Sequence, residues 1–323
     1  MGASGIYHWP VMVSEVLESL GVHPGGTYID CTLGDAGHAV AILEAAAGPE
    51  SGGKPGRLLG LDADPESFAT ARQRLSPYGE SAVLVNTNFE HLGQAAAREG
   101  FVPADGVLFD LGLSSRQLEA EDRGFSFRRT APLDMRFSAD GELTAHEIVN
   151  EWPEEELANL IFKLGEEPRS RRIAKAIVRN RTITDAKHLA DVVARSAGYT
   201  KSRTHPATRT FQALRMGVNH EIESLQAGLD QATSVLGEGG RLVTISYHSL
   251  EDREIKRFVV RSDRMKAVVK KVIRPSKGEI ERNPRSRSAK LRVVERLLPG
   301  SDEGQERRLT GRRMKEHQHG IRE

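Results

Sequence analysis

The residues best suited to chemistry lie between Tyr28 and His38, where an apolar stretch gives way to the loop Gly34-Asp-Ala-Gly37. The β-favouring residues 27–29 predict a strand, and the apolar run after His38 predicts a helix. Strand, glycine loop and helix form the first unit of a nucleotide-binding α/β sheet. Its glycines allow close backbone approach, and the helix N-terminus offers free N–H groups to a ligand. The same pattern is also compatible with a plain tight turn.

An acidic residue, Asp62, ends the next predicted strand, 25 residues after Gly37. An acid at that point is placed to accept hydrogen bonds from ribose hydroxyls, and its alternative role is the N-cap of a helix that opens at Pro65. Dinucleotide enzymes and S-adenosylmethionine enzymes share this layout. Asp35 inside the loop would repel a pyrophosphate but attract the cationic sulfonium and amine of S-adenosylmethionine. The loop therefore favours a methyltransferase over a nicotinamide-dependent dehydrogenase.

The elements that must position these residues alternate between strands and helices. Strands are predicted at about 27–30, 57–62, 81–85, 104–110 and 241–247, with Gly239-Gly240 as a turn before the last. Helices are predicted at 11–20 (ending at Gly21), 38–48, 65–75, 91–100, 221–235 and 250–261. Residues 265–273 and 290–297 read as a final, hairpin-like pair of strands. This alternation is typical of a doubly wound parallel sheet, an α/β fold.

The strand rhythm stops between residues 116 and 216. The segment 116–150 is polar and strand-poor, and helical patterns dominate from Pro153, including 153–164 and a run that Thr184 caps and Gly198 ends. Structureless loops of this length are rare, so we expect an inserted helical domain. Residues 49–56 are rich in Gly, Pro and Ser and predict a surface loop.

The charge distribution is uneven although the 323 residues carry a net charge of only +1. From Arg253 onward there are 22 Lys+Arg against 10 Asp+Glu, a net +12, which leaves −11 for the first 252 residues. Residues 160–215 are locally basic, with 13 Lys+Arg against 4 Asp+Glu. Two basic segments suggest a polyanionic partner, although a solvated surface and a loose tail would look the same.

Cysteine usage and hydropathy bear on the compartment. Cys31 is the only cysteine, so no disulfide can form within the chain, which fits a reducing cytoplasm. No apolar run approaches the ~20 residues of a membrane helix, and no signal-peptide core is visible. The histidines do not cluster with metal-ligand spacing, so no metal is expected.

Specific motifs run along nearly the whole chain up to about residue 298. They are His8-x-Pro-Val-Met12, Asp30-x-Thr-x-Gly34 with Gly37-His38, Asp62-x-Asp64, Asp110-Leu-Gly-Leu-Ser-Ser115, Arg123-Gly-Phe-Ser-Phe127, Pro132-Leu-Asp-Met-Arg136, Gly165-Glu-Glu167, His205-Pro-Ala-Thr-Arg-Thr-Phe-Gln-Ala-Leu-Arg215, Ser246-Tyr-His-Ser-Leu-Glu-Asp-Arg253 and Asn283-Pro-Arg-Ser-Arg-Ser-Ala-Lys-Leu-Arg292. In these the chain resembles the bacterial small-subunit ribosomal RNA (cytosine-N4-)-methyltransferase H family. One departure is Ala36, where the family usually has glycine; it would crowd the loop if its φ must be positive.

The resemblance implies a fold, a cofactor and a substrate. The fold is α/β, a Rossmann-like S-adenosylmethionine-dependent methyltransferase sheet with an inserted all-helical domain. The implied domains are 1–117 with 217–298 (methyltransferase), 118–216 (inserted, substrate recognition) and 299–323 (a disordered basic tail). The reaction is methyl transfer from S-adenosylmethionine to the exocyclic N4 of a cytidine in the decoding region of small-subunit ribosomal RNA.

The family's cofactor contacts are carried over residue by residue. They are Ala36, Gly37, His38, Asp62, Phe89, Asp110 and Gln117. Many amino-methyltransferases have Asp-Pro-Pro-Tyr after strand four, whereas the sequence here is Asp110-Leu-Gly-Leu113. Either Asp110 or loop carbonyls could accept hydrogen bonds from the target amine, and we hypothesise that Asp110 is this catalytic group. Phe89 can pack on adenine or belong to the core, and Gln117 can bind the cofactor or lie on the surface.

The target base must leave its stack to reach the cofactor. Phe125, Phe127, Arg136 and the helix from Arg209 to Arg215 are the groups expected to hold it, and His248 and Ser249 either line the pocket or only form a turn. Carbon-5 methylation would need a thiolate, and Cys31 reads more simply as a core residue.

The expected partner is ribosomal RNA in the assembled or nearly assembled small subunit, with no membrane contact, and a homodimer is a further hypothesis. The alternative function is a catalytically silent RNA-binding ribosome assembly factor on a methyltransferase scaffold.

Overall fold

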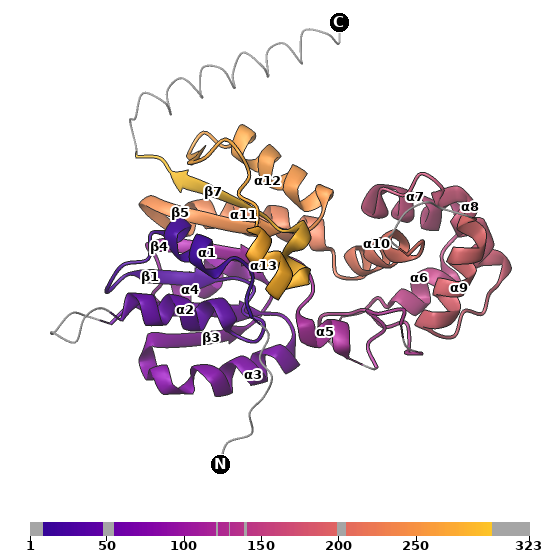
Figure 1. Ribbon diagram of the computed structural model, residues 1–323, viewed down its shortest axis with the longest axis horizontal. Coiled ribbons are helices and arrows are strands. Elements are labelled where there is room, and N and C mark those ends of the chain that lie inside the picture. The colour runs from indigo at the N-terminus through magenta and orange to yellow at the C-terminus, as the bar shows by residue number, and fades with distance from the viewer. Residues whose placement is uncertain are drawn as a thin grey trace, which may run out of the picture. The chain divides into compact units, whose positions relative to one another are not determined.

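The computed structural model describes residues 9–47, 55–120, 122–128, 130–138, 141–198 and 205–298. It divides the chain into two compact units (Figure 1): unit 1 contains residues 1–112 and 224–323, and unit 2 contains residues 113–223. His8, most of the predicted loop 49–56 and the predicted tail 299–323 lie outside the described residues.

Unit 1 is built on a seven-stranded sheet in the order β3-β2-β1-β4-β5-β7-β6. The strands are β1 (Thr27–Asp30), β2 (Arg57–Asp62), β3 (Ala82–Asn86), β4 (Ala104–Asp110), β5 (Leu236–Ser246), β6 (Met265–Ala267) and β7 (Lys290–Arg296). The first five in the sheet are parallel, whereas β7 runs antiparallel to both β5 and β6. The strand order reverses between β1 and β4, and ligands of such sheets bind at the carboxyl ends of the strands at this point.

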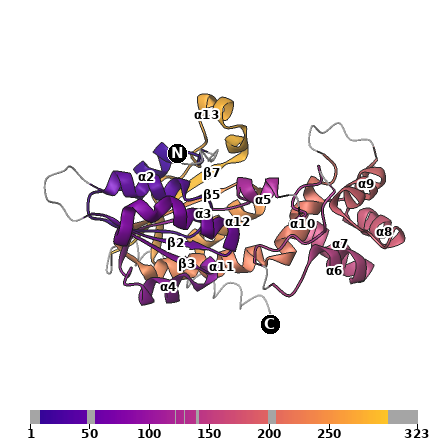
Figure 2. The same ribbon diagram turned by 90° about the horizontal axis from the view of Figure 1, so that it is seen from below.

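Helices cover both faces of the sheet, and Figure 2 shows α2 and α4 on opposite sides of the strands. The helices of unit 1 are α1 (Val13–Leu20), α2 (Gly37–Ala46), α3 (Pro65–Leu75), α4 (Leu92–Arg98), α11 (Glu221–Val235), α12 (Ser249–Arg261) and α13 (Lys277–Arg282), with α11 beginning just inside unit 2. Alternate strand residues face opposite layers: Phe109 packs with α4, α11 and α12, whereas Leu108 packs with α1, α2 and α3. This is the α/β fold that the sequence predicts.

Unit 2 is helical. Its helices are α5 (Ser115–Glu119), α6 (Ala145–Glu151), α7 (Glu154–Gly165), α8 (Ser170–Arg179), α9 (Ala186–Ala197) and α10 (Thr208–Val218). Apolar faces of α6 to α10 share one core that includes Ile148, Ile161, Ile177 and Leu214. The helical insert is therefore a unit with a core of its own, as a segment of this length needs.

Two local predictions for strands are wrong in their bounds. Gly239-Gly240 is no turn ahead of the strand; it lies inside β5, where the pairing with β4 shifts register between Ala104 and Gly106. The strand predicted over 265–273 ends at Ala267, and only Ile273 returns to bridge Leu291.

The predicted cap of α9 is also displaced by one residue. Asp185 is the N-cap, and it accepts a hydrogen bond from the His188 N–H over 2.9 Å. Thr184 supports it by donating from its hydroxyl to Asp185 Oδ2 over 2.8 Å.

Within the described ranges, no helix has the length and apolar character needed to cross a membrane.

Candidate active site

Three carboxylates stand at the carboxyl ends of three adjacent strands in unit 1. Asp30 ends β1, Asp62 ends β2 and Asp110 ends β4. β1 lies between the other two strands, so Asp30 is flanked by both neighbours. The electrostatic repulsion from Asp110 and Asp62 contributes to the raised pKa of Asp30. This edge of the sheet is therefore an anionic site at the point where the strand order reverses.

Asp62 ties the glycine loop to the end of β2. Its Oδ2 accepts the Gly34 N–H over 2.7 Å, and its Oδ1 accepts the Asp64 N–H over 2.8 Å. Burial raises the pKa of Asp62 to about 6, although these two hydrogen bonds act to lower it. The helix N-cap role falls to Asp64, which accepts the Glu66 N–H over 3.1 Å. A carboxylate has about four acceptor positions, so Asp62 retains capacity for two hydroxyl donors.

Asp30 is 1 % exposed and is held through Thr32. Its Oδ1 accepts the Thr32 N–H over 3.1 Å, whereas its Oδ2 is buried with no hydrogen-bond partner in the described part of the chain. Burial is the largest cause of its pKa near 6, and the neighbouring carboxylates add to it. The Thr32 hydroxyl accepts the Asp110 N–H over 2.6 Å and so joins the ends of β1 and β4.

Asp110 is hydrogen-bonded to Tyr247, the residue after β5. The Tyr247 hydroxyl donates to Asp110 Oδ1 over 2.9 Å. Burial raises the pKa of Asp110 to about 7, and the bond from Tyr247 acts against this rise. Burial and the Asp110 carboxylate together hold the pKa of Tyr247 well above its ordinary value, so the phenol remains a donor. Gly112, with φ +107°, leaves room for the ring, since a Cβ there would lie 3.3 Å from Tyr247 Cδ2.

His38 faces the N-terminal segment and the Asp110 carboxylate. Its Nε2 donates to the Val11 carbonyl over 2.9 Å, and its Nδ1 lies 3.6 Å from Asp110 Oδ2. Burial lowers the pKa of His38, which favours the neutral ring with its proton on Nε2. The Nδ1 lone pair then faces Asp110 Oδ2, and a pKa of about 7 allows a fraction of Asp110 to carry a proton at neutral pH.

The glycine loop is held tightly from the other side by Pro10. Ala36 is the N-cap of α2 at φ +60°, a left-handed conformation, and it is fully buried. Gly37 follows it, and a Cβ at Gly37 would lie 3.0 Å from Pro10 Cβ. The N-terminal segment is anchored in turn by α13, because the Met12 N–H donates to Glu279 Oε1 over 2.6 Å. With φ at +60°, Ala36 occupies the left-handed backbone region for which glycine is best suited.

Phe89 follows β3 and packs with its edge against Phe109, with ring centroids 5.4 Å apart. Its ring is only partly buried. Gly228 of α11 completes the contact, since a Cβ there would lie 3.1 Å from the Phe89 ring. One edge of the ring thus packs against the core, and the contact of Phe89 with a cofactor stays a prediction.

The sequence profile of the MraW methylase family matches residues 5–297. The chain belongs to this family. Curated relatives named ribosomal RNA small subunit methyltransferase H include a Dehalococcoides mccartyi protein, 48% identical over 312 residues that cover 91% of this chain and 88% of the relative. A Thermomicrobium roseum relative of the same name is 47% identical over 311 residues, covering 90% and 94% of the two chains.

Membership of the MraW methylase family places the protein among S-adenosylmethionine-dependent methyltransferases. The anionic site fits this cofactor, which carries two positively charged groups. Three acidic side chains that repel one another would be relieved by a sulfonium and an ammonium group, whereas a pyrophosphate would add to the repulsion. The site residues Ala36, Gly37, His38, Asp62, Phe89 and Asp110 all lie in unit 1.

Cys31 is buried, and burial raises the pKa of its thiol well above the ordinary value, so it offers no thiolate for carbon-5 chemistry.

Gln117 lies in unit 2, where it completes a capping box. Its Oε1 accepts the Ser114 N–H over 3.0 Å, and its own N–H donates to Ser114 Oγ over 3.1 Å. The side chain is 6 % exposed. A structural role at the start of α5 is therefore established for Gln117, and its contact with a cofactor stays a prediction.

The groups that the sequence suggested for holding the target base have partners within their own unit. Phe127 stacks on His205 with centroids 4.6 Å apart, and Phe125 stacks on Phe137 at 5.8 Å. Arg136 makes two hydrogen bonds to the Asp134 carboxylate, of 2.9 and 2.7 Å.

The arginines of α10 are paired as well. Arg215 bonds both oxygens of Glu221 over 2.6 and 2.8 Å, and Arg209 lies 3.7 Å from Glu167.

His248 is the N-cap of α12, and the Glu251 side chain accepts a hydrogen bond from the His248 backbone N–H. Of the two roles considered for His248, the structure shows the one in the turn. These side chains stabilise the fold.

Sequence reasoning did not select Tyr247, Thr32 or Asp30 as site residues. Tyr247 and Asp110 are 137 residues apart, and only the pairing of β4 with β5 brings them together. Asp30 did carry a signal, because it is an acid at the end of a strand that is otherwise buried. A buried strand rarely ends on an acid without a partner or ligand to justify it.

Proposed function

We propose that this MraW-family methylase transfers a methyl group from S-adenosylmethionine to the exocyclic N4 of a cytidine in the decoding region of small-subunit ribosomal RNA. The curated relatives, named ribosomal RNA small subunit methyltransferase H, support the substrate class over nine-tenths of the chain. The single observation that carries the chemistry is the Asp110 carboxylate at the strand-order reversal, which is hydrogen-bonded to Tyr247 and lies on the strand beside the one that ends in Asp30.

The cofactor would supply an electrophilic methyl carried on a sulfonium. Asp62 would accept hydrogen bonds from the ribose hydroxyls with the acceptor positions that Gly34 and Asp64 leave open. The exposed part of Phe89 would pack on the adenine. The backbone at Ala36, Gly37 and His38 would face the amino-acid end, where the negative charge of Asp30 favours an ammonium group.

The exocyclic amine of cytosine is a weak nucleophile because its lone pair is delocalised into the ring. Asp110 would accept a hydrogen bond from the amine, orient it and stabilise the positive charge that develops as the N–C bond forms and the S–C bond breaks. The amine then loses one proton, for which a carboxylate with a pKa of about 7 is a competent acceptor at neutral pH. Tyr247 would hold Asp110 in place and keep enough of it ionised.

The insert, unit 2, would contact the RNA around the target, and the preferred substrate would be the assembled or nearly assembled small subunit in the cytoplasm. Methylation of purified subunits and of naked RNA, compared at equal concentration, tests this preference. The homodimer stays a separate hypothesis, which light scattering on the purified protein would settle.

The decisive experiment compares nucleosides from small-subunit ribosomal RNA of cells with and without this gene by mass spectrometry. We expect an N4-methylated cytidine to disappear, and to return when purified protein and S-adenosylmethionine are added. Unchanged nucleosides would refute the proposed substrate. Tight binding to subunits without any modification would favour the silent assembly factor instead.

A further inference from the structure

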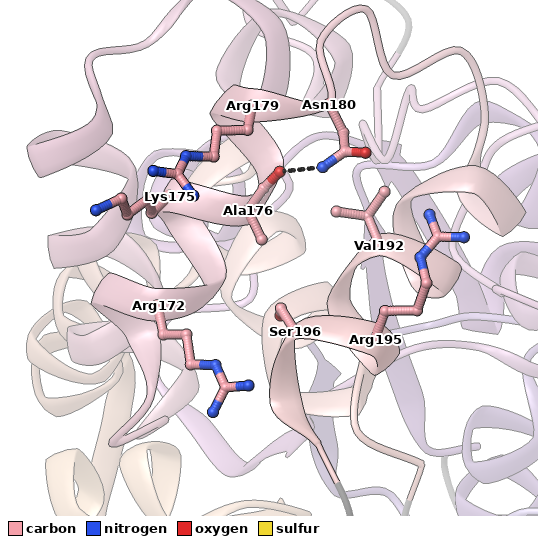
Figure 3. A pocket seen from close by; sticks show the side chains of 8 residues that line it. All are labelled: Arg172, Lys175, Ala176, Arg179, Asn180, Val192, Arg195 and Ser196. Carbon is pink, nitrogen blue, oxygen red and sulfur yellow. Dashed lines mark hydrogen bonds between the residues drawn. The ribbon is translucent and has the colours of Figure 1, made fainter.

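A cavity of about 360 Å³ opens between α8 and α9 in unit 2 (Figure 3). Its polar lining consists of Arg172, Lys175, Arg179, Asn180, Arg195 and Ser196. Four of these six side chains are cationic, and no acidic residue lines the cavity. All residues that line the cavity belong to unit 2, whereas the three carboxylates of the candidate active site belong to unit 1.

Among the residues that the structure describes, the four cations have no counter-ions. No ion pair or side-chain hydrogen bond links Arg172, Lys175, Arg179 or Arg195 to any other part of the described chain, and all four side chains are exposed. Other arginines of the same unit behave differently: Arg136 and Arg215 each bond a carboxylate, and Arg181 donates to the Val149 carbonyl over 2.9 Å. The cavity is thus lined by cations that make no contact of this kind with the rest of the described chain.

Helix geometry explains why three of these cations share one face of α8. Arg172, Lys175 and Arg179 are spaced i, i+3 and i+7, so they form one stripe along α8. The opposite face, with Ile173 and Ile177, is buried in the unit's core and fixes the stripe outward. Arg195 and Ser196 extend from α9 on the other side of the cavity (Figure 3). Like charges on one helix face repel, which costs stability unless an anion is bound between them.

We propose that this cavity, the α8–α9 cleft, binds consecutive phosphates of the substrate RNA backbone. This proposal rests on the proposed function, because it takes ribosomal RNA as the partner. The stripe from Arg172 to Arg179 spans about 10 Å at 1.5 Å per residue, which exceeds one phosphate and suits a run of backbone. Arginine forks bond phosphate oxygens in pairs, and the lining contains no aromatic ring for stacking on a base. The cleft therefore positions RNA and does not read its sequence.

The test compares two charge-matched double variants. Arg172→Gln with Arg195→Gln removes one cation from each wall of the cleft. The control, Arg171→Gln with Lys187→Gln, removes two exposed cations from the same helices that do not line it. Binding to small subunits is measured over a series of salt concentrations, together with cofactor affinity and the kinetics of methyl transfer.

We expect the cleft variant to bind subunits at least about 10-fold more weakly and to lower the slope of log affinity against log salt by about 1 to 2, as for one or two lost phosphate contacts. Its KM for subunits should rise while kcat and cofactor affinity stay unchanged. The control should lose less than about 3-fold. Circular dichroism and thermal unfolding should match wild type, because all four substituted side chains are exposed.

Each contrary result has a definite meaning. Equal losses in both variants would show a diffuse electrostatic effect and overturn the cleft. Normal subunit binding by the cleft variant, with wild-type methyl transfer intact, would overturn the cleft alone. If the cleft variant lost only binding of ATP or tripolyphosphate, the occupant would be a free phosphate compound and not RNA. Wild-type protein that neither bound nor methylated subunits would refute the proposed function as well.

Discussion

The Tyr247 hydroxyl donates to Asp110 Oδ1 over 2.9 Å, and this bond works against the effect of burial on the carboxyl. Tyr247→Phe removes the bond and should raise the pKa of Asp110 above about 7. A hydrogen bond to a charged group is worth about 1.5–3 kcal/mol, so the acid limb of the pH–rate profile should move about one to two units to higher pH.

The control for this variant is Tyr78→Phe, the same chemical change at a tyrosine whose hydroxyl donates to Glu44 over 3.4 Å, away from the candidate active site. Methyl transfer is followed from pH 5.5 to 9 with both variants. A Tyr247→Phe profile that overlays wild type would show that Asp110 ionisation does not limit the reaction.

Asp110→Asn should lower kcat by at least about 100-fold, because the amide cannot supply the negative charge that stabilises a developing cation. The fold should survive, since the substitution is close to isosteric. Asp105→Asn, on the same strand but half exposed, is the matched control. Turnover within a few-fold of wild type for Asp110→Asn would remove this residue from the mechanism.

The free protein should become less stable as pH rises from about 4 to about 7. The folded-state pKa of Asp110, about 7, exceeds its ordinary 3.8, so the folded state holds a proton that the unfolded chain has released. The stabilisation is fully present below pH 4 and is lost as pH passes through 7; Asp30 and Asp62, with pKa values near 6, act in the same direction.

Urea unfolding at a series of pH values measures this trend. In Asp110→Asn the decline should become shallower, because one of the three raised carboxyls is gone. A cationic ligand should oppose the decline, since it favours the ionised carboxylates. Stability that climbed steadily from pH 4 to pH 7 would contradict the raised pKa values.

Gly37→Ala should destabilise the protein by about 1–3 kcal/mol and weaken cofactor binding. The new methyl would lie 3.0 Å from Pro10, so the N-terminal segment must move away from the loop. Gly278→Ala in α13 is the control, because its added methyl meets nothing within 4 Å. Calorimetry and cofactor titration read out both effects, and an unchanged melting temperature for Gly37→Ala would argue that the segment is loosely held.

Ala36→Gly should change stability by less than about 1 kcal/mol. Relief of the left-handed strain at φ +60° is offset by the greater freedom of glycine in the unfolded chain and by the loss of a buried methyl. Ala36→Val, by contrast, should cost more than about 2 kcal/mol. If the glycine variant bound the cofactor several-fold more tightly, Ala36 would be shown to crowd the loop.

Local signals in the sequence predicted much of the sheet. The strands 57–62 and 104–110 and the helices 65–75 and 221–235 have the bounds that were expected. Pro65 is a strong start signal because proline suits the first helical turn, and Asp64 caps the same helix.

Partner choice could not be predicted, because it depends on contacts between distant residues. Arg136 and Arg215 looked like RNA ligands by composition, yet each bonds a carboxylate of its own unit. The cations of the α8–α9 cleft are residues of the same types, yet they bond no carboxylate among the residues that the structure describes. Tyr247 was missed for a related reason, since its role depends on the pairing of β4 with β5 and not on its neighbours in sequence.

The chain leaves the sheet at Asp110 and begins β5 only at Leu236, with all of unit 2 in between. During synthesis, unit 2 is complete before the ribosome has made the strand that must lie beside β4. We therefore expect the insert to fold around its own core before β5 pairs with β4, and during this time one edge of β4 has no hydrogen-bond partners. A nascent chain stalled before residue 236 would expose that edge, so aggregation during slow translation should begin at β4.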